Sequence, residues 1–449
     1  MKTYQDLIAV GNSDSDRMDF VKQSIDYHKT TAMYKTAVIA DQYNRFKNVT
    51  IAEYQKILYT VSGKAIADVW SANFKMACRH FHRFIIQENQ YLLGNGVSWK
   101  NSDTADKLGT HNCAFDTQLS ELGKNALVHG VGFGFFNLDH LEVFSLLEFV
   151  PLYDEENGGL RAGIRFWQID SQKPLRATLY EEDGYTDYIW KDGKGEVLRN
   201  KDGVAKRTYK YAYTKSNIDG EHIYAFENYP AFPIVPLWGN SEHQSEIVGL
   251  REQIDCFDLI KSGFANSVDE ASIMYWTIQN AGGMDSDVDL AKFIKRMKTV
   301  HATIMDDNAQ VSSHSQDAPY ASREALLDRL DKDLYRDAMA LNPEIISGGA
   351  VTATQIKAAY EPLNSKTDDF EYQVISFVDK ILYLAGIDDT PTFTRSILVN
   401  TSETIQNIML AKDALPKEYI TKKILEVLGD GDKAKDIIEQ MRGADSPNG

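Results

Sequence analysis

The sequence has few cysteines, no long hydrophobic run and no recognisable catalytic motif. Its three cysteines, Cys78, Cys113 and Cys256, are scattered and form no CxxC pair, which argues against a disulfide framework and indicates a reducing compartment. No run of roughly 18 apolar residues predicts a membrane span, and the polar N-terminus lacks an apolar signal core. We therefore expect a chain that is made in the cytoplasm and stays there or assembles from there.

Positive charge is also scarce. The 449 residues include 48 Lys and Arg against 65 Asp and Glu, for a formal net charge of −17. Affinity for duplex DNA comes mainly from basic side chains that displace counterions, so wrapping of DNA by a basic face is disfavoured. An acidic surface instead suits a protein that lets a polyanion pass without holding it.

Constellations for catalysis or metal binding are missing as well. The GxSxG nucleophile motif is absent, and the adjacent acids lie in turn-like sequence where carboxylates are usually solvated. A zinc site would need tighter paired spacings than the sequence offers. We predict no catalytic residue, no metal and no cofactor. The residues weighed for zinc are Cys78, His80, His82, His111 and Cys113.

What is present is an ordinary globular composition, 43% hydrophobic and 25% charged, which can bury a sizeable core. Residues 1–100 are mostly helix by pattern, including Ile66–Tyr91, and 112–128 is a further helix. From Gly130 to Trp238, short β-rich runs alternate with turn dipeptides such as Asp183-Gly184, which predicts a meander of hairpins.

The stretch Gly130-Val131-Gly132-Phe133-Gly134 is similar to a nucleotide-binding loop at first sight. Such a loop needs a helix N-terminus directly after the glycines to receive phosphate. Strand-like sequence follows here, so we predict a strand interrupted by glycines.

Three helices dominate the second half of the chain. A capping-box pattern at Ser241 precedes an apolar stripe that predicts a helix of roughly 35 residues, fading near Gly282. A second helix starts after Ser322 and stops at Asn342-Pro343. A third starts at Thr352 and contains Pro362, which should kink it. The connector Asn342–Val351 contains two glycines, which give its backbone freedom.

Residues 284–320 between the first two helices are mixed, with a basic cluster in an otherwise acidic chain. The cluster is either a solvated helix face or a docking point for an acidic partner or DNA phosphate. Its members are Lys292, Lys295, Arg296 and Lys298. After the third helix, a strand (Thr392–Asn400) and short helices (401–441) follow.

This order of features resembles the portal proteins of tailed bacteriophages, the siphophage type in particular. The segments that carry the resemblance are Tyr91-Leu92-Leu93-Gly94-Asn95, Phe232-Pro233-Ile234-Val235-Pro236, Leu250–Phe264 and Ser347-Gly348-Gly349-Ala350. Some relatives have Ser-Gly-x-Ala-Leu where this chain has Ser-Gly-Gly-Ala-Val, a mild departure.

The resemblance implies an α+β portal fold. Its expected regions are a wing (1–243), a stem helix (244–280), a clip (281–320), a second stem helix (321–341), a tunnel loop (342–351), a long kinked helix (352–385), a wing strand (386–401) and a crown with a tail (402–449).

The resemblance also implies a non-enzymatic structural role in the virion. The subunit would form a ring, commonly of twelve copies, at one capsid vertex, through which double-stranded DNA is packaged and ejected. Expected partners are terminase, a head-completion or adaptor protein, and the major capsid and scaffolding proteins, with no membrane. The DNA-facing candidates are Asn342, Glu344, Ile345, Ile346, Ser347, Gly348, Gly349, Ala350 and Val351, and the basic candidates add Lys261 to the cluster above.

Two alternatives stay open at this point. Another virion protein, such as a capsid or adaptor subunit, would show a β-dominated core without two long helices separated by a loop. A hydrolase with a β-rich substrate domain would need a convergent acid, base or metal site.

Overall fold

The computed structural model describes residues 2–59, 63–69, 71–110, 113–209, 213–217, 220–224, 228–271, 275–279, 310–314, 320–347, 353–396 and 415–428, with a few single residues elsewhere. Internal packing divides the chain into two units. The first consists of Met1–Asp41, Arg83–Val248 and Tyr335–Gly449, and the second of Gln42–His82 and Gly249–Leu334. Both helices and sheets are present, which confirms the predicted α+β class.

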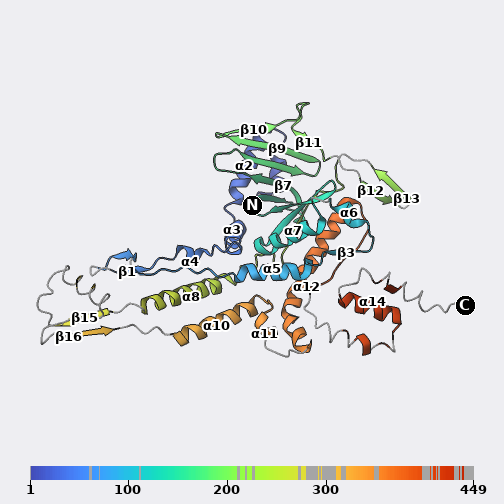
Figure 1. Cartoon of the computed structure of the whole chain (residues 1–449). Helices are drawn as coiled ribbons and strands as arrows, with labels where there is room; N and C mark the ends of the chain where they lie inside the picture. The colour runs from blue at the N-terminus through green and yellow to red at the C-terminus, as the bar shows by residue number, and fades with distance from the viewer. Residues whose placement is uncertain are drawn as a thin grey trace. The chain divides into compact units, whose positions relative to one another are not determined.

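The helices, drawn as coiled ribbons in Figure 1, are α1 (Tyr4–Val10), α2 (Asp14–His28), α3 (Ala32–Asn44), α4 (Val49–Glu53), α5 (His80–Leu93), α6 (Thr104–Leu108), α7 (Phe115–His129), α8 (Arg251–Ala271), α10 (Tyr320–Asp337), α11 (Pro343–Ser347), α12 (Ala353–Ala385) and α14 (Lys417–Leu428). The strands are β1 (Ile57–Tyr59), β2 (Ala65–Ala67), β3 (Val97–Trp99), β4 (Val131–Asn137), β5 (His140–Ser145), β6 (Phe149–Tyr153), β7 (Leu160–Trp167), β8 (Leu175–Glu181), β9 (Gly184–Lys191), β10 (Lys194–Leu198), β11 (Lys206–Arg207), β12 (Tyr213–Asn217), β13 (Gly220–Tyr224), β14 (Ile234–Trp238), β15 (Tyr275–Gln279), β16 (Gln310–His314) and β17 (Pro391–Phe393).

The largest sheet of the first unit is the predicted antiparallel meander, in the order β10-β9-β8-β7-β6, with β11 also pairing β9. The two-residue β9–β10 turn has positive φ at both Asp192 (51°) and Gly193 (77°), which matches the twist of a tight hairpin. Helices α1 and α2 cover one face of this sheet (Figure 1). The core there joins Leu7, Phe20, Val21 and Ile25 of the helices to Leu152, Ile164, Leu179, Tyr188 and Trp190 of the strands.

A second sheet, ordered β14-β4-β5, explains the glycine-rich stretch. A Cβ on Gly132 would lie 2.7 Å from a methyl carbon of Leu122 in α7, and one on Gly134 would lie 2.5 Å from the Phe377 ring of α12. The glycines therefore let two helices approach β4 closely. The predicted glycine-interrupted strand is confirmed, and these glycines serve packing.

In the second unit, α8 and α10 lie antiparallel to each other. Arg323 of α10 donates to the carbonyl oxygen of Gly263 at 3.1 Å and also bonds Ser267, both in α8. The rings of Phe264 and Tyr320 meet edge to face at 5.7 Å. The antiparallel strand pair β15–β16 lies between these helices in the sequence.

An extended segment, residues 71–79, binds along the polar side of α8. Alternate backbone amides donate to side chains four residues apart on the helix, because two extended residues advance about 6.6 Å and four helical residues advance about 6 Å. The pairs are Phe74 N with Asn266 Oδ1 (2.7 Å), Met76 N with Ser262 Oγ (2.9 Å) and Cys78 N with Asp258 Oδ1 (2.8 Å). We call this arrangement the strap ladder.

Some predicted helix boundaries are wrong. The helix expected from Ser241 begins at Arg251, because Gly249 has φ +84° and Ser245 Oγ instead donates to the carbonyl oxygen of Val128 at 2.5 Å. It ends at Ala271, and β15 follows. The helix expected over Ile66–Tyr91 is the strand β2, the extended segment of the strap ladder and then α5.

Other boundaries differ less. Residues 310–314, within the region expected to be mixed, form β16. The strand expected over 392–400 is the shorter β17, with residues 397–400 outside the described part. The helix predicted to end before Pro343 ends at Asp337. Pro362 lies inside the third helix, as predicted.

The strap ladder predicts the effect of removing one acceptor. Asp258→Ala leaves the buried Cys78 amide and the Asn48 side-chain amide without their carboxylate, at a cost of about 3 kcal/mol. Hydrogen exchange of the Cys78 amide should therefore accelerate roughly a hundredfold. The matched control is Glu252→Gln, an exposed carboxylate on the same helix, which should leave that rate unchanged. Equal rates in both variants would show that the ladder does not stabilise the segment.

Candidate functional site

The predicted loop region begins where α10 ends. Met339 has a left-handed φ of 52°. The amide of Ala340 donates to the carbonyl oxygen of Tyr335 at 2.9 Å, and the amide of Met339 donates to the carbonyl oxygen of Arg336 at 3.1 Å. This pair of bonds is a Schellman motif, which usually has glycine at the left-handed position. The chain therefore leaves the helix in a defined direction.

The first half of the region is helical, whereas the sequence predicted an irregular loop. Asn342 caps α11, since its Oδ1 accepts from the amide of Glu344 at 2.9 Å, and Pro343 occupies the first helical position. Asn342 is buried, while Glu344 is exposed and Ile345 is 57% exposed. Ile346 and Ser347 complete the helix. Gly348, Gly349, Ala350 and Val351 lie outside the described residues.

The residue before this short helix is fixed to α5. The side-chain amide of Gln87 donates to the carbonyl oxygen of Leu341 at 3.0 Å and accepts from its amide at 3.0 Å. Leu341 also packs with Tyr91, Tyr360 and Leu363. The Tyr91 and Tyr360 rings stack at 5.6 Å. The loop therefore starts from a point held by α5 and α12 together.

A buried lysine ties the same elements together. Lys366 Nζ on α12 lies 2.7 Å from Glu88 Oε2 on α5 and 2.6 Å from Glu246 Oε2. It also donates to the carbonyl oxygen of Ala338, beside the end of α10, at 3.3 Å. The Lys366 side chain is 15% exposed and that of Glu88 is 2% exposed. We call Lys366, Glu88 and Glu246 the buried triad.

Two members of the buried triad, Glu88 and Lys366, have shifted pKa values. Burial of the Glu88 carboxylate raises its pKa from 4.5 to about 7, although the Lys366 ammonium opposes the rise, and the Glu246 carboxylate adds to it. Burial lowers the pKa of Lys366, but the two carboxylates outweigh that effect and hold it above its ordinary value. Protonation of Glu88 leaves a neutral Lys366–Glu246 pair, whereas its ionisation leaves one uncompensated buried charge.

A second basic side chain, that of Arg395, also binds carboxylates of α12. Arg395, after β17, pairs with Asp368 and lies 2.7 Å from Glu371 Oε2. It donates to Asn364 Oδ1 at 3.3 Å, and Asn364 Oδ1 accepts from the Tyr91 hydroxyl at 2.6 Å. Both basic groups next to the loop's anchorage are therefore held by two carboxylates each.

The predicted basic residues lie elsewhere. Lys261 is half-buried on α8, with its ammonium 5.6 Å from the centre of the Phe257 ring. Lys292 and Lys295 are exposed, in residues with helical backbone. Arg296 and Lys298 lie outside the described residues. Lys261, Lys292 and Lys295 belong to the second unit, and the loop belongs to the first.

The residues weighed for zinc have other contacts. His80 lies 2.7 Å from Asp331 Oδ1, and His82 lies 2.9 Å from Asn44 Oδ1. Cys78 is buried in the strap ladder, and His111 lies outside the described residues. Within the described part of the chain, no group of three or more His, Cys, Asp or Glu side chains could hold a metal ion. None of the described helices is long and apolar enough to cross a membrane.

An α+β chain with two antiparallel helices, a short anchored connector and a long proline-containing helix has the features of a phage portal subunit. The sequence matches the family described as "Phage portal protein, SPP1 Gp6-like" over residues 51–446. Since the match covers most of the chain, this protein belongs to that family.

Two curated relatives, both named "Portal protein", agree with this assignment. The protein from Bacillus phage SPP1 is 22% identical over 387 residues, covering 80% of this chain and 74% of the relative. The protein from Clostridium phage phiCD119 is 24% identical over 212 residues, covering 45% of this chain. The match thus spans about half the length of the phiCD119 protein, 47%.

Solved structures similar to this chain come from a gene transfer agent particle. The neck of the empty particle, computed with C6 symmetry, gives a TM-score of 0.45 at 10% identity, covering 78% of this chain and 90% of that chain. The neck of the native particle, computed with C12 symmetry, gives 0.42 at 11% identity, covering 77% and 89%.

The buried triad predicts a pH dependence of stability. Because the pKa of Glu88 is raised on folding, its contribution is fully present below about 4.5 and is lost as the pH rises through about 7. In Glu88→Gln this titration is absent. The free energy of unfolding of the wild type, minus that of the variant, should fall between pH 5 and pH 7 and level off above it, as measured by denaturant unfolding across pH.

Glu121→Gln, an exposed glutamate on α7, is the control and should show no such trend against the wild type. A difference between wild type and Glu88→Gln that stays flat over this range would mean that Glu88 is ionised in the folded protein.

The helix end at Met339 gives a second prediction. Glycine adopts the left-handed conformation without the penalty of a Cβ, so Met339→Gly should stabilise the protein by about 1 kcal/mol. Thermal unfolding should register a higher midpoint. Ala338→Gly, one residue earlier and without a positive φ, is the control and should lower the midpoint. A lower midpoint for Met339→Gly would indicate that packing of its side chain outweighs the backbone strain.

Proposed function

We propose that the chain is the subunit of a portal ring of twelve copies at one capsid vertex, the channel through which double-stranded DNA is packaged and ejected. Membership of the portal family supports this proposal. The observation that carries it is the connector between α10 and α12, which is anchored at Leu341 and exposes Glu344 and Ile345. Such an arrangement can present a short segment to a large ligand while its base stays fixed.

The regions are assigned accordingly. Residues 244–280 and 321–341, which contain α8 and α10, are proposed as the stem, and 281–320 as the clip. Residues 342–351 are proposed as the tunnel loop, 352–385 as the long helix, 1–243 with 386–401 as the wing, and 402–449 as the crown and tail. In a ring, heterologous contacts between copies would cover apolar side chains that are exposed on the stem, such as Val268 and Leu326.

Electrostatics favours passage over retention. Twelve copies would multiply a charge of −17 per chain, and such a lumen repels phosphate. Near the proposed tunnel loop, Lys366 and Arg395 are each held by two carboxylates, so they are not available to trap DNA. Lys261, Lys292, Lys295, Arg296 and Lys298 are proposed to moderate the repulsion locally.

The proposed partners follow from the same role. The clip would face terminase during packaging and a head-completion or adaptor protein afterwards, and the wing would meet major capsid and scaffolding proteins. The subunit would be assembled in the host cytoplasm, would act in the virion and would carry no enzymatic activity of its own.

A packaging assay tests the proposal. Neutralising the five basic residues together, each to Gln, should leave rings with a central hole in negative-stain images but change the amount of nuclease-protected DNA about threefold or more. Lys22→Gln, an exposed lysine on α2, should change neither. Normal rings with unchanged packaging would show that these five residues do not influence DNA packaging. Wild-type chains that stay monomeric at every salt concentration would overturn the ring itself.

A further inference from the structure

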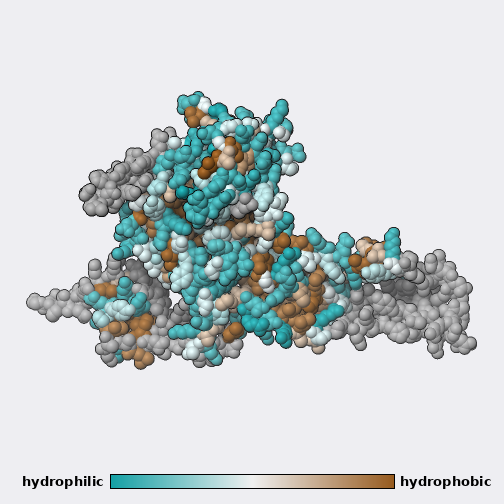
Figure 2. Space-filling model, turned by 180° about the vertical axis from the view of Figure 1, so that it is seen from behind, coloured by the Kyte–Doolittle hydropathy of each residue, from teal (hydrophilic) through white to brown (hydrophobic). Residues whose placement is uncertain are grey.

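The buried triad at the base of the connector contains more negative than positive charge. Most of the described surface seen in Figure 2 is hydrophilic, and charged side chains ordinarily lie at such a surface. The side chains of Glu88, Lys366 and Glu246 are instead only 2%, 15% and 14% exposed. When all three groups are ionised, two carboxylates share one ammonium. One negative charge then has no counter-charge within the triad, which is costly for a buried group.

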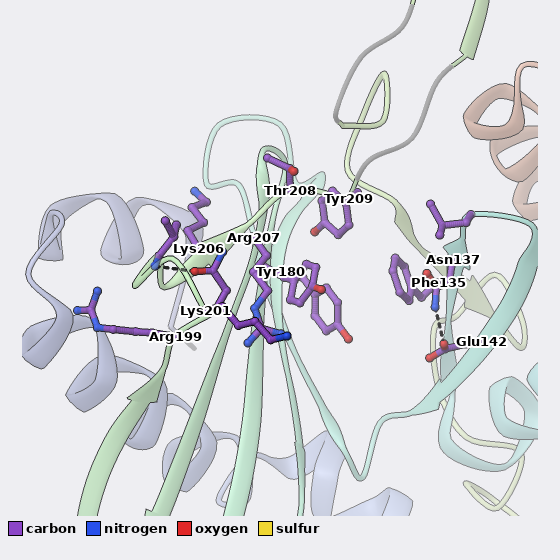
Figure 3. A pocket seen from close by; sticks show the side chains of 14 residues that line it. Phe135, Asn137, Glu142, Tyr180, Arg199, Lys201, Lys206, Arg207, Thr208 and Tyr209 are labelled. Carbon is purple, nitrogen blue, oxygen red and sulfur yellow. Dashed lines mark hydrogen bonds between the residues drawn. The ribbon is translucent and has the colours of Figure 1, made fainter.

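Ion pairs elsewhere in the same unit are not subject to this constraint. In the pocket between β8, β9 and the strands β4 and β5, three of the basic side chains each meet a carboxylate of the chain (Figure 3). Those three cations are at least 34% exposed, so water screens their charges. The pairs are Arg199 with Asp14, Lys206 with Glu181 and Asp183, and Arg207 with Asp187. The surplus charge of the triad is set apart by its burial.

Neighbouring elements contribute further charged and titratable groups. They are Asp369 of α12, Arg83 of α5, Arg336 and Asp337 at the end of α10, and His129 at the end of α7. The Asp369 carboxylate adds to the negative charge that acts on Glu88. The two cations have partners of their own, since Arg83 bonds to the Tyr335 hydroxyl and Arg336 lies 3.5 Å from Asp337. His129 is buried beside the segment of Glu246, whose amide donates to the carbonyl oxygen of Leu127 at 3.1 Å.

The segment 338–341, which leads into the connector, is bound at both ends by the helices of the triad. At its start, Lys366 Nζ donates to the carbonyl oxygen of Ala338 at 3.3 Å. At its end, Leu341 exchanges two hydrogen bonds of 3.0 Å with the side chain of Gln87, the residue before Glu88 in α5. The segment is therefore held by one member of the triad and by the neighbour of another. Its release would admit water to the triad.

We propose that the buried triad is a proton switch for the segment 338–341: a proton on Glu88 keeps the segment bound, and loss of that proton favours its release. With Glu88 neutral, one ammonium and one carboxylate remain as a balanced pair. Release lets water reach Glu88, which stabilises the ionised form. Burial of Glu88 raises its pKa to about 7, so the proton is lost near neutral pH. The switch does not depend on ring formation, whereas its use in setting the freedom of the proposed tunnel loop rests on the proposed function.

Hydrogen exchange of the full-length protein, followed by mass spectrometry on peptides that contain the Leu341 amide, tests the switch. The rate at each pH is divided into the intrinsic rate, which gives a protection factor. Because the pKa of Glu88 is higher in the bound state than in water, protection should fall about tenfold from pH 5.5 to pH 7.5. Glu88→Gln should abolish this fall. Glu121→Gln, an exposed glutamate on α7, is the control and should retain it.

A second variant separates the switch from a merely structural role. Glu246→Gln leaves Glu88 in place but matches one carboxylate to one ammonium, so the pKa of Glu88 should drop and the fall in protection should become smaller. Protection that is flat with pH in the wild type, or an unchanged fall in Glu246→Gln, would overturn the proposal. A fall that persists in Glu88→Gln would assign the pH dependence to another group, such as His129, and would overturn it as well. Wild-type chains that form no rings but show the expected fall would refute the proposed function and support the switch.

Discussion

The arrangement around the connector depends on keeping one lysine charged inside the protein. Lys366 can stay charged there only because Glu88 and Glu246 lie within 2.7 Å of its ammonium. Those carboxylates come from two other parts of the chain, so satisfying the charge fixes α12 against α5 and against the segment before α8. The bond from Lys366 to the carbonyl oxygen of Ala338 adds the end of α10. The connector that follows has a rigid base for this reason.

The second unit satisfies its polar groups by a different route. The strap ladder works because a helix and an extended segment have nearly equal repeats, about 6 Å for four residues and about 6.6 Å for two. Asp258, Ser262 and Asn266 therefore bind the chain's own backbone. This polar stripe of α8, which the sequence pattern alone would place in solvent, is therefore buried. In the proposed stem, the exposed apolar side chains of α8 and α10 would then be the part left for other subunits.

Much of this architecture was predictable, because patterning and turn chemistry act locally. The meander, α7 and the proline in α12 follow from alternation, periodicity and turn dipeptides. The start of α8 could not be predicted from the sequence, because the hydrogen bond from Ser245 to Val128 is a tertiary contact that competes with the capping pattern. The buried triad did leave a signal. Lys366 falls three residues after Leu363 and four before Phe370, so it occupies the apolar stripe of its helix, where a charge requires a partner. Which carboxylates supply that partner depends on the tertiary fold.

The distribution of charge around the connector bears on the proposed function. Around the connector, Lys366 and Arg395 are outnumbered by Glu88, Glu246, Asp368 and Glu371, so the cations that hold the structure together add no net positive charge. The proposed role of guiding DNA without retaining it would require this, since each free cation facing phosphate would add affinity and slow movement.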